Sequence, residues 1–370
     1  MEKKKSIFSY YKPYKKIFFA DMFFAIMASI ITLVIPLVVR YITSTVIYYE
    51  TDEAFRVILK LGLMMTVLIL FQCYCNYFIA NYGHVMGAKI EYDMRAEIFA
   101  HYQKLPFSFY DNQKVGQLLS RITSDLFDIT ELLHHGPENV VISAMKFIGA
   151  FVILFTISPK LTFAAFALIP FMFLYAWFFN RKMKKAFARN RVKIADINAQ
   201  IEDNLSGIRV VKSFANESVE EEKFKVGNDG FLAAKKDSYL YMGGYHSGLT
   251  AFINMITVIV LVAGGILITK AQVSVTDLVT FLLYISIMTD PVRTMIDFAE
   301  MFQNGYSGYE RFQEILAIEP DIQDSQGSEE LTDVKGTIDF ENVSFQYEEN
   351  TEKVPVSYTH LRAHETDQYL

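Results

Sequence analysis

The sequence predicts an all-α membrane protein that crosses a bilayer six times. Its 370 residues are 52% hydrophobic and have a mean hydropathy of +0.21. A positive mean over this length indicates that many apolar side chains face lipid. Six windows of about 20 residues are apolar enough to span the hydrocarbon layer: 17–39, 57–80, 139–157, 161–180, 248–269 and 277–299. The composition excludes an ordinary water-soluble fold and a largely disordered chain.

Two of the six windows contain charges that are costly in lipid. Lys146 lies in the third, and Asp290, Arg293 and Asp297 lie on one helical side of the sixth. We therefore predict that these residues face protein or water, which makes them candidates to line a cavity. Two interpretations stay open for the sixth window, a solvated gate or a ladder of charges that neutralise one another. Lys146 either pairs with one of these acids or extends to the interface.

The basic residues predict the orientation. Residues 1–16, 81–138 and 181–247 contain 6, 5 and 13 Lys and Arg, whereas the alternate loops are short and contain few. Loops rich in Lys and Arg stay in the cytoplasm. We expect both termini inside the cell and a plasma-membrane location.

The two long inner loops continue the helical pattern past the bilayer. An unbroken helix from Val57 to Leu105 is about 70 Å long at about 1.5 Å per residue, more than twice the hydrocarbon thickness. Stalks of this length are expected in a protein that receives force from a cytoplasmic motor.

The motifs that carry a family resemblance lie in these loops. They are LPFSFYDNQKVGQLLSRITSDL at 105–126 and EDNLSGIRVVKSFANESVEEEKF at 202–224. Over residues 10–347 the chain resembles the transmembrane domain of ATP-binding cassette (ABC) exporters, the six-helix half-transporter type of bacterial lipid and multidrug exporters. The resemblance implies coupling helices at about 111–120 and 206–214 that contact nucleotide-binding domains. The coupling residues are Asp111, Val115, Gly116, Gln117, Ser206, Gly207, Ile208, Arg209 and Val210.

Arg121 and Asp125, four residues apart, either take part in coupling or simply brace a helix.

The C-terminal region resembles the start of a nucleotide-binding domain. Residues 316–335 are a polar linker, and 336–347 alternate apolar and polar residues like a first strand. Tyr347 occupies the family position that stacks on adenine, although a lone strand tyrosine also suits packing. Residues 356–370 resemble a tail appended to a truncated gene model.

The chain contains no GxxxxGK[ST] phosphate loop, so we expect no ATP hydrolysis and no catalytic residue. The resemblance implies ATP and Mg²⁺ in the intact parent and none bound by this fragment. His360 and His364 lack a third metal ligand nearby in sequence, so no metal site is predicted. Cys73 and Cys75 are expected to be buried and structural.

The predicted division is a cytoplasmic segment (1–16), a six-helix transmembrane domain (17–315), a linker (316–335), a fragment of a nucleotide-binding domain (336–355) and the tail (356–370). The resemblance implies the membrane half of an ATP-driven exporter for an amphipathic drug, lipid or peptide. Its partners would be the lipid bilayer, nucleotide-binding domains and a second half-transporter, identical or different, and no nucleic acid. The alternatives are a regulatory or sensor membrane protein without a motor, or a non-functional truncated product.

Overall fold

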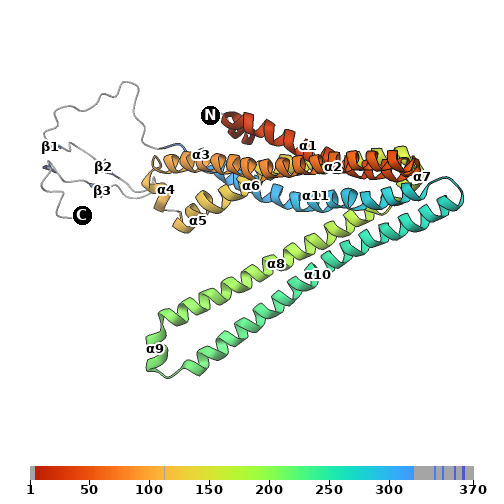
Figure 1. Cartoon of the computed structure of the whole chain (residues 1–370). Coiled ribbons are helices and arrows are strands. Elements are labelled where there is room, and N and C mark those ends of the chain that lie inside the picture. Colours follow the sequence, from red (N-terminus) through yellow and green to blue (C-terminus); the bar gives the residue numbers. More distant parts are fainter. Residues whose placement is uncertain are drawn as a thin grey trace. The chain divides into compact units, whose positions relative to one another are not determined.

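The computed structural model describes residues 5–111 and 113–320, together with the backbone of four two-residue strands beyond them. The chain divides into two units, residues 1–319 and 320–370. In the first unit, six long helical rods run roughly alongside one another (Figure 1).

Each rod consists of one or more helices. In chain order they are η1 (Ile7–Tyr14) with α1 (Lys15–Ser44) and η2 (Val46–Tyr48); α2 (Thr51–Phe78), η3 (Ile79–Gly83) and α3 (His84–Tyr102); α5 (Val115–Ser120), η4 (Arg121–Asp125) and α6 (Leu126–Ile157); α7 (Pro159–Phe166) with α8 (Ile169–Ser206); α10 (Glu217–Thr269); and α11 (Val275–Leu316). Here η1 and η2 are 3₁₀ helices, while η3 and η4 are single π turns inside otherwise α-helical rods. Two short helices, α4 (Phe107–Asp111) and α9 (Ile208–Ser213), lie between rods.

The turns at one end of the unit are tight because local chemistry stops and restarts each helix. Ser158 separates α6 from α7, and its side chain caps the new helix by accepting from the Leu161 amide. Ala271 adopts a left-handed conformation (φ 53°) after α10. Ser274 and Asp277 then form a capping box that begins α11.

All six predicted spans are confirmed as apolar helices long enough to cross a membrane, and every rod extends beyond its predicted window. The longest, α10, has 53 residues and is about 80 Å long. The predicted window 161–180 is not one helix. It breaks at residues 167–168, because Pro170 lacks an amide hydrogen and fits only the first turn of the following helix.

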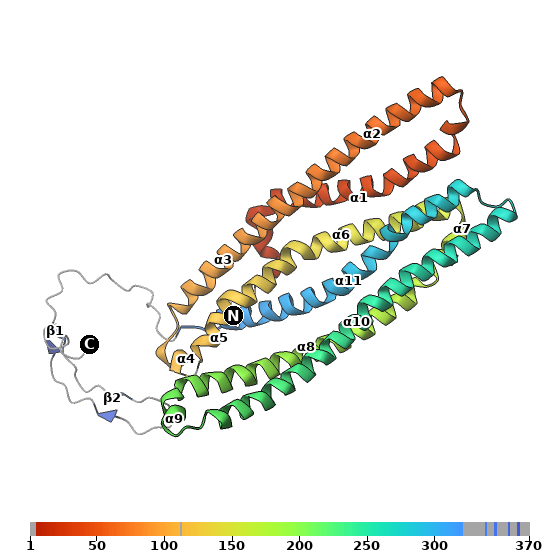
Figure 2. The same ribbon diagram turned by 60° about the horizontal axis from the view of Figure 1, so that its bottom comes forward.

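Two apolar clusters hold the rods together. The first joins α1, α6, α8, α10 and α11 around Met172, Tyr245, Phe281 and Tyr284. The second lies nearer the α4–α5 end and joins η1, α3, α5, α6 and α11 around Ile90, Leu126 and Phe312. Helices α8 and α10 pack mainly against each other, whereas α6 packs against α11, α1 and α3 (Figure 2).

The cysteine prediction was right for Cys75 and wrong for Cys73. Cys75 is the one buried residue of α2, while Cys73 is exposed, and both are free thiols. Two positions apart on a helix are about 200° apart in azimuth, so the two side chains cannot share the buried side.

In the second unit the described residues form two short antiparallel pairs. Thr337–Ile338 (β1) pairs with Leu361–Arg362 (β4), and Ser344–Phe345 (β2) pairs with Val354–Pro355 (β3). Both β1 and β2 fall within residues 336–347, the segment predicted to form a first strand. Tyr347 lies outside the described residues.

Candidate coupling ends and membrane-embedded charges

The first predicted coupling segment consists of two short helices with a bend between them. The prediction of one helix over 111–120 was approximate, since α4 ends at Asp111 and α5 begins at Val115, after an extended Lys114. Asp111, Val115, Gly116 and Gln117 are all exposed, and Val115 keeps 79% of its surface.

Tyrosine contacts fix this segment to the rod before it. Leu118 is buried in the second apolar cluster, and its carbonyl accepts from the Tyr102 hydroxyl at 3.5 Å. The Tyr110 hydroxyl donates to the Tyr102 carbonyl. One face of α5 is therefore held against the unit while Val115 and Leu119 stay on the surface.

The second predicted coupling segment, 206–214, contains α9. Gly207 ends α8, and Ala215 turns the chain into α10 with a left-handed φ of 50°. The predicted residues Ser206, Ile208, Arg209 and Val210 are exposed, and Gly207 is half-buried. Residues 181–247 form an arm in which parts of the long helices α8 and α10 are joined by the short helix α9. The tip of this arm thus presents apolar side chains.

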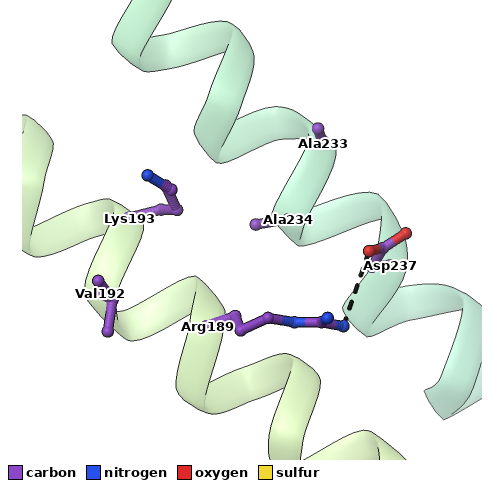
Figure 3. Close-up of a pocket in the computed structure, with 6 residues that line it drawn as sticks. All are labelled: Arg189, Val192, Lys193, Ala233, Ala234 and Asp237. Atoms are coloured by element: carbon purple, nitrogen blue, oxygen red, sulfur yellow. Dashed lines mark ion pairs between the residues drawn. The ribbon is translucent and has the colours of Figure 1, made fainter.

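The arm surface is charged and only loosely paired. Figure 3 shows a pocket on it between α8 and α10, where Arg189 of α8 and Asp237 of α10 form an ion pair at 3.8 Å and Ala233 and Ala234 are among the other lining residues. At the tip, Lys212 hydrogen-bonds Glu217 at 2.9 Å and lowers the pKa of that carboxyl. All four charged groups of these two pairs are solvent-exposed, so the pairs add little stability.

Both candidate coupling segments lie at the same end of the first unit. Figures 1 and 2 place α4–α5 and α9 opposite the end where the turns after α1, α6 and α10 lie. Two exposed surfaces about 90 residues apart in sequence therefore lie at the same end of the unit, where one partner could contact both.

Sequence reasoning missed the contact that braces the first segment. It placed Asp125 beside Arg121, but the Asp125 carboxylate accepts two hydrogen bonds from Arg311 of α11, both at 2.7 Å. Arg121 instead donates to the Arg311 carbonyl at 3.4 Å. The pairing raises the pKa of Arg311. The partners are 186 residues apart, so no local spacing signalled them.

The charges of the sixth predicted span lie on the surface of α11. Asp290, Arg293 and Asp297 are exposed, and no ion pair joins them within residues 5–320. The Arg293 guanidinium lies 3.0 Å from His246 Nδ1 of α10. The three residues therefore form an exposed polar strip on α11, and Arg293 in its middle contacts α10.

Lys146 lies on α6, half-buried, and forms no ion pair within 4 Å with any charged group of residues 5–320. The structure does not bring it together with Asp290 or Asp297.

Residues 18–292 match a family model described as the ABC transporter transmembrane region. The chain belongs to this family. It is a multi-pass membrane protein with six apolar rods.

Three curated relatives give the scale of the similarity. "Uncharacterized ABC transporter ATP-binding protein YwjA" of Bacillus subtilis is 36% identical over 94% of this chain and 60% of its own length. "Putative multidrug export ATP-binding/permease protein YgaD" of the same organism is 25% identical over 95% and 61%. A Staphylococcus aureus protein with the same functional name as YgaD is 26% identical over 94% and 61%. The chain spans about 60% of the length of these relatives.

Proposed function

We propose that this chain forms the membrane-spanning half of an ATP-driven exporter and passes motion from nucleotide-binding domains to a translocation path. The observation that carries the proposal is the pair of exposed short segments, α4–α5 and α9, at one end of rods much longer than a bilayer. Rods of this length act as levers, because a push at the tip is transmitted along a continuous hydrogen-bonded helix.

The relatives' printed names support the partners. Their names refer to ATP binding, and two refer to multidrug export. We propose that the intact protein uses ATP and Mg²⁺, with Tyr347 stacking on the adenine, and that the substrate is an amphipathic drug, lipid or peptide. The membrane is the plasma membrane, with both termini in the cytoplasm.

A second half-transporter would complete the path. Helix α2 has a single fully buried residue, Cys75, and the arm contacts the other rods only near its base. A single unit of this kind cannot enclose an aqueous route, so we propose a homodimer or heterodimer. The strip Asp290, Arg293 and Asp297, with Lys146 on α6, would line the enclosed cavity.

Cysteine labelling tests the placement of the tips. Val115→Cys and Val210→Cys are introduced separately into a background with Cys73→Ser and Cys75→Ala, and a membrane-impermeant maleimide is applied to right-side-out or inverted vesicles. Both positions should be labelled only in inverted vesicles. Val275→Cys, exposed at the opposite end of the unit, is the matched control and should be labelled only in right-side-out vesicles. Labelling of 115 and 210 from opposite sides would sink the proposal.

A chimera tests the transmission of motion. Residues 1–335 are joined to the C-terminal part of YwjA, and Asp290→Cys reports access to the proposed path in the same cysteine-free background. Trapping with ATP and vanadate should change the labelling rate at 290 severalfold. Val210→Asp at the tip should abolish that change, whereas Val192→Asp on the exposed side of the arm should preserve it. A labelling rate unaffected by trapping in a chimera that hydrolyses ATP would contradict the coupling role.

A further inference from the structure

A buried polar cluster lies where α1, α3 and α6 meet, away from the coupling tips and the charged strip of α11. Its centre consists of Asp21 on α1 and His134 and Glu138 on α6. Asp21 is fully buried and His134 is 3% exposed. One ligand atom from each of the three lies within 4.8 Å of the others, and His84 and His135 stand beside them.

Most of the potential ligand atoms at this centre have no hydrogen-bond partner. Both carboxylate oxygens of Asp21 and Nδ1 of His134 are buried and have no hydrogen-bond partner within the described residues 5–111 and 113–320, and Oε2 of Glu138 is buried with only the ion-pair contact to His135. Burying such a group without a partner is unfavourable, and most of all for a charged group. Three acceptors without a partner, on Asp21 and His134, converge from two helices beside the carboxylate of Glu138, and this arrangement points to a ligand that carries positive charge.

The surrounding contacts orient His134 as a ligand. Its Nε2 lies 3.1 Å from Nδ1 of His84, and the ring centroids are 4.4 Å apart. A hydrogen on Nε2 of His134 satisfies this bond and leaves Nδ1 as a bare acceptor facing Asp21 and Glu138. Metal-bound histidines are typically held in this way, with the second ring nitrogen donating to a neighbour. His135 places Nδ1 3.4 Å from Glu138 Oε2.

The backbone of the second rod is brought unusually close to the cluster. A Cβ added at Gly83 would lie 2.4 Å from Cε1 of His134 and 2.9 Å from Oδ1 of Asp21. Gly83 ends the π turn η3, and π turns inside α-helices often occur at functional sites. The glycine and the extra residue of the π turn let α3 approach Asp21 and His134 while placing His84 next to them.

We propose that Asp21, His134 and Glu138 bind one divalent transition-metal ion of the Zn²⁺ type. Two carboxylates supply the negative charge that the ion neutralises, and the imidazole nitrogen favours Zn²⁺ over Mg²⁺ or Ca²⁺. Donor atoms around tetrahedral zinc lie about 3.3 Å apart for bonds of about 2.0–2.1 Å, so the three atoms close by at most about 1.5 Å. The alternative set of His84, His134 and His135 is disfavoured, because two of its nitrogens already bond each other.

Such an ion would tie α1 to α6. The two rods already pack together, and α6 also carries the contacts to α11 and α3. The metal would thus stiffen the base of the first coupling segment without touching the arm. This inference does not depend on the proposed transport function.

Zinc binding by the purified chain in detergent tests the proposal. The background variant His360→Ala/His364→Ala removes the two tail histidines. After chelator treatment and dialysis against Zn²⁺, elemental analysis should find one zinc per chain, and X-ray absorption should show nitrogen and oxygen ligands at about 2.0–2.2 Å. Asp21→Asn and Glu138→Gln, which preserve shape, and His134→Ala should each weaken zinc binding at least tenfold.

Two further variants sharpen the test. His84→Ala should weaken binding about 10–100-fold, as loss of a supporting hydrogen bond does. His246→Ala, at an exposed histidine outside the cluster, is the control and should bind zinc like the background variant. Each variant is compared by its elution from a sizing column, so that loss of fold is separated from loss of a ligand. Failure of the folded background variant to retain zinc, or unchanged binding by folded Asp21→Asn, would overturn the proposal.

Discussion

The end of the bundle that carries α4–α5 and the arm are both built from long helical rods, yet they are held in different ways. In the bundle, the second apolar cluster and the Asp125–Arg311 pair join α3, α5, α6 and α11. In the arm, α8 and α10 pack mainly against each other, contact α11 only near the base through pairs such as Lys184–Glu300, and carry mostly exposed ion pairs. The two proposed coupling segments are therefore supported unequally. The segment α4–α5 is held by packing and by an ion pair at its base, whereas α9 lies at the end of an arm that has few contacts with the rest of the unit.

Removing a large side chain from the brace should have the largest effect. Phe312 is 1% exposed in the second apolar cluster, and Phe312→Ala should lower the free energy of unfolding by about 3–5 kcal/mol. The matched change Phe214→Ala at the exposed arm tip should alter it by less than about 0.5 kcal/mol. Denaturant unfolding in detergent measures both. Equal losses would remove the contrast between the regions.

Breaking one ion pair in each region should again destabilise the bundle more than the arm, but by a smaller difference in the free energy of unfolding. Asp125→Ala leaves Arg311 without its two short hydrogen bonds and should cost about 1.5–3 kcal/mol. Asp237→Ala removes the long, exposed pair with Arg189 on the arm and should cost about 0–1 kcal/mol. A double-mutant cycle with Arg311→Ala checks that the loss at Asp125 belongs to this pair.

Two glycines on α10, Gly243 and Gly248, lie where α10 passes from the loosely packed arm to close packing against α8. A Cβ at Gly248 would lie 2.2 Å from the ring of Tyr175, whose hydroxyl donates to the Gly244 carbonyl at 2.8 Å. Gly248→Ala should therefore cost about 1–3 kcal/mol through overpacking. Gly243, with no atom within 4 Å of an added Cβ, should gain about 0.5–1 kcal/mol as alanine through helix propensity. Thermal unfolding of the two variants should show opposite signs.

The smallest effect is expected at the arm tip, in a titration. The hydrogen bond from Lys212 lowers the pKa of Glu217, so this pair stabilises the fold above the ordinary pKa of glutamate and the contribution fades as pH falls through the lowered value. Lys212→Gln should raise the pKa of Glu217 toward its ordinary value, as followed by carbon NMR of labelled glutamate. The melting temperature should stay unchanged, because both groups are exposed.

Patterns with a fixed local period were predictable from the sequence. Apolar runs gave all six spans, and continued helical spacing gave rods such as Thr51–Tyr102 close to the predicted 57–105. The family resemblance, and not a local period, gave the short segments at 111–120 and 206–214, within a few residues of where α4, α5 and α9 lie.

Contacts between distant residues were not predictable in this way. Asp125 lies four residues from Arg121, but the π turn between them leaves it against Arg311. Asp21 sits inside an apolar window, and only the packing of α1 on α6 brings it to His134. One carboxylate hardly changes the mean hydropathy of a 20-residue window, so Asp21 did not stand out. Nothing in a single sequence shows which distant residue it contacts.

The π turns η3 and η4 each insert one residue into a rod that is otherwise α-helical. One residue corresponds to about 100° of helical azimuth. Deleting a single residue from either turn would therefore rotate the segment that follows by more than a quarter turn about the rod axis. The direction in which α4–α5 points therefore depends on the number of residues in each rod as well as on its contacts, and a homologous rod with a different number of residues would point its tip in another direction.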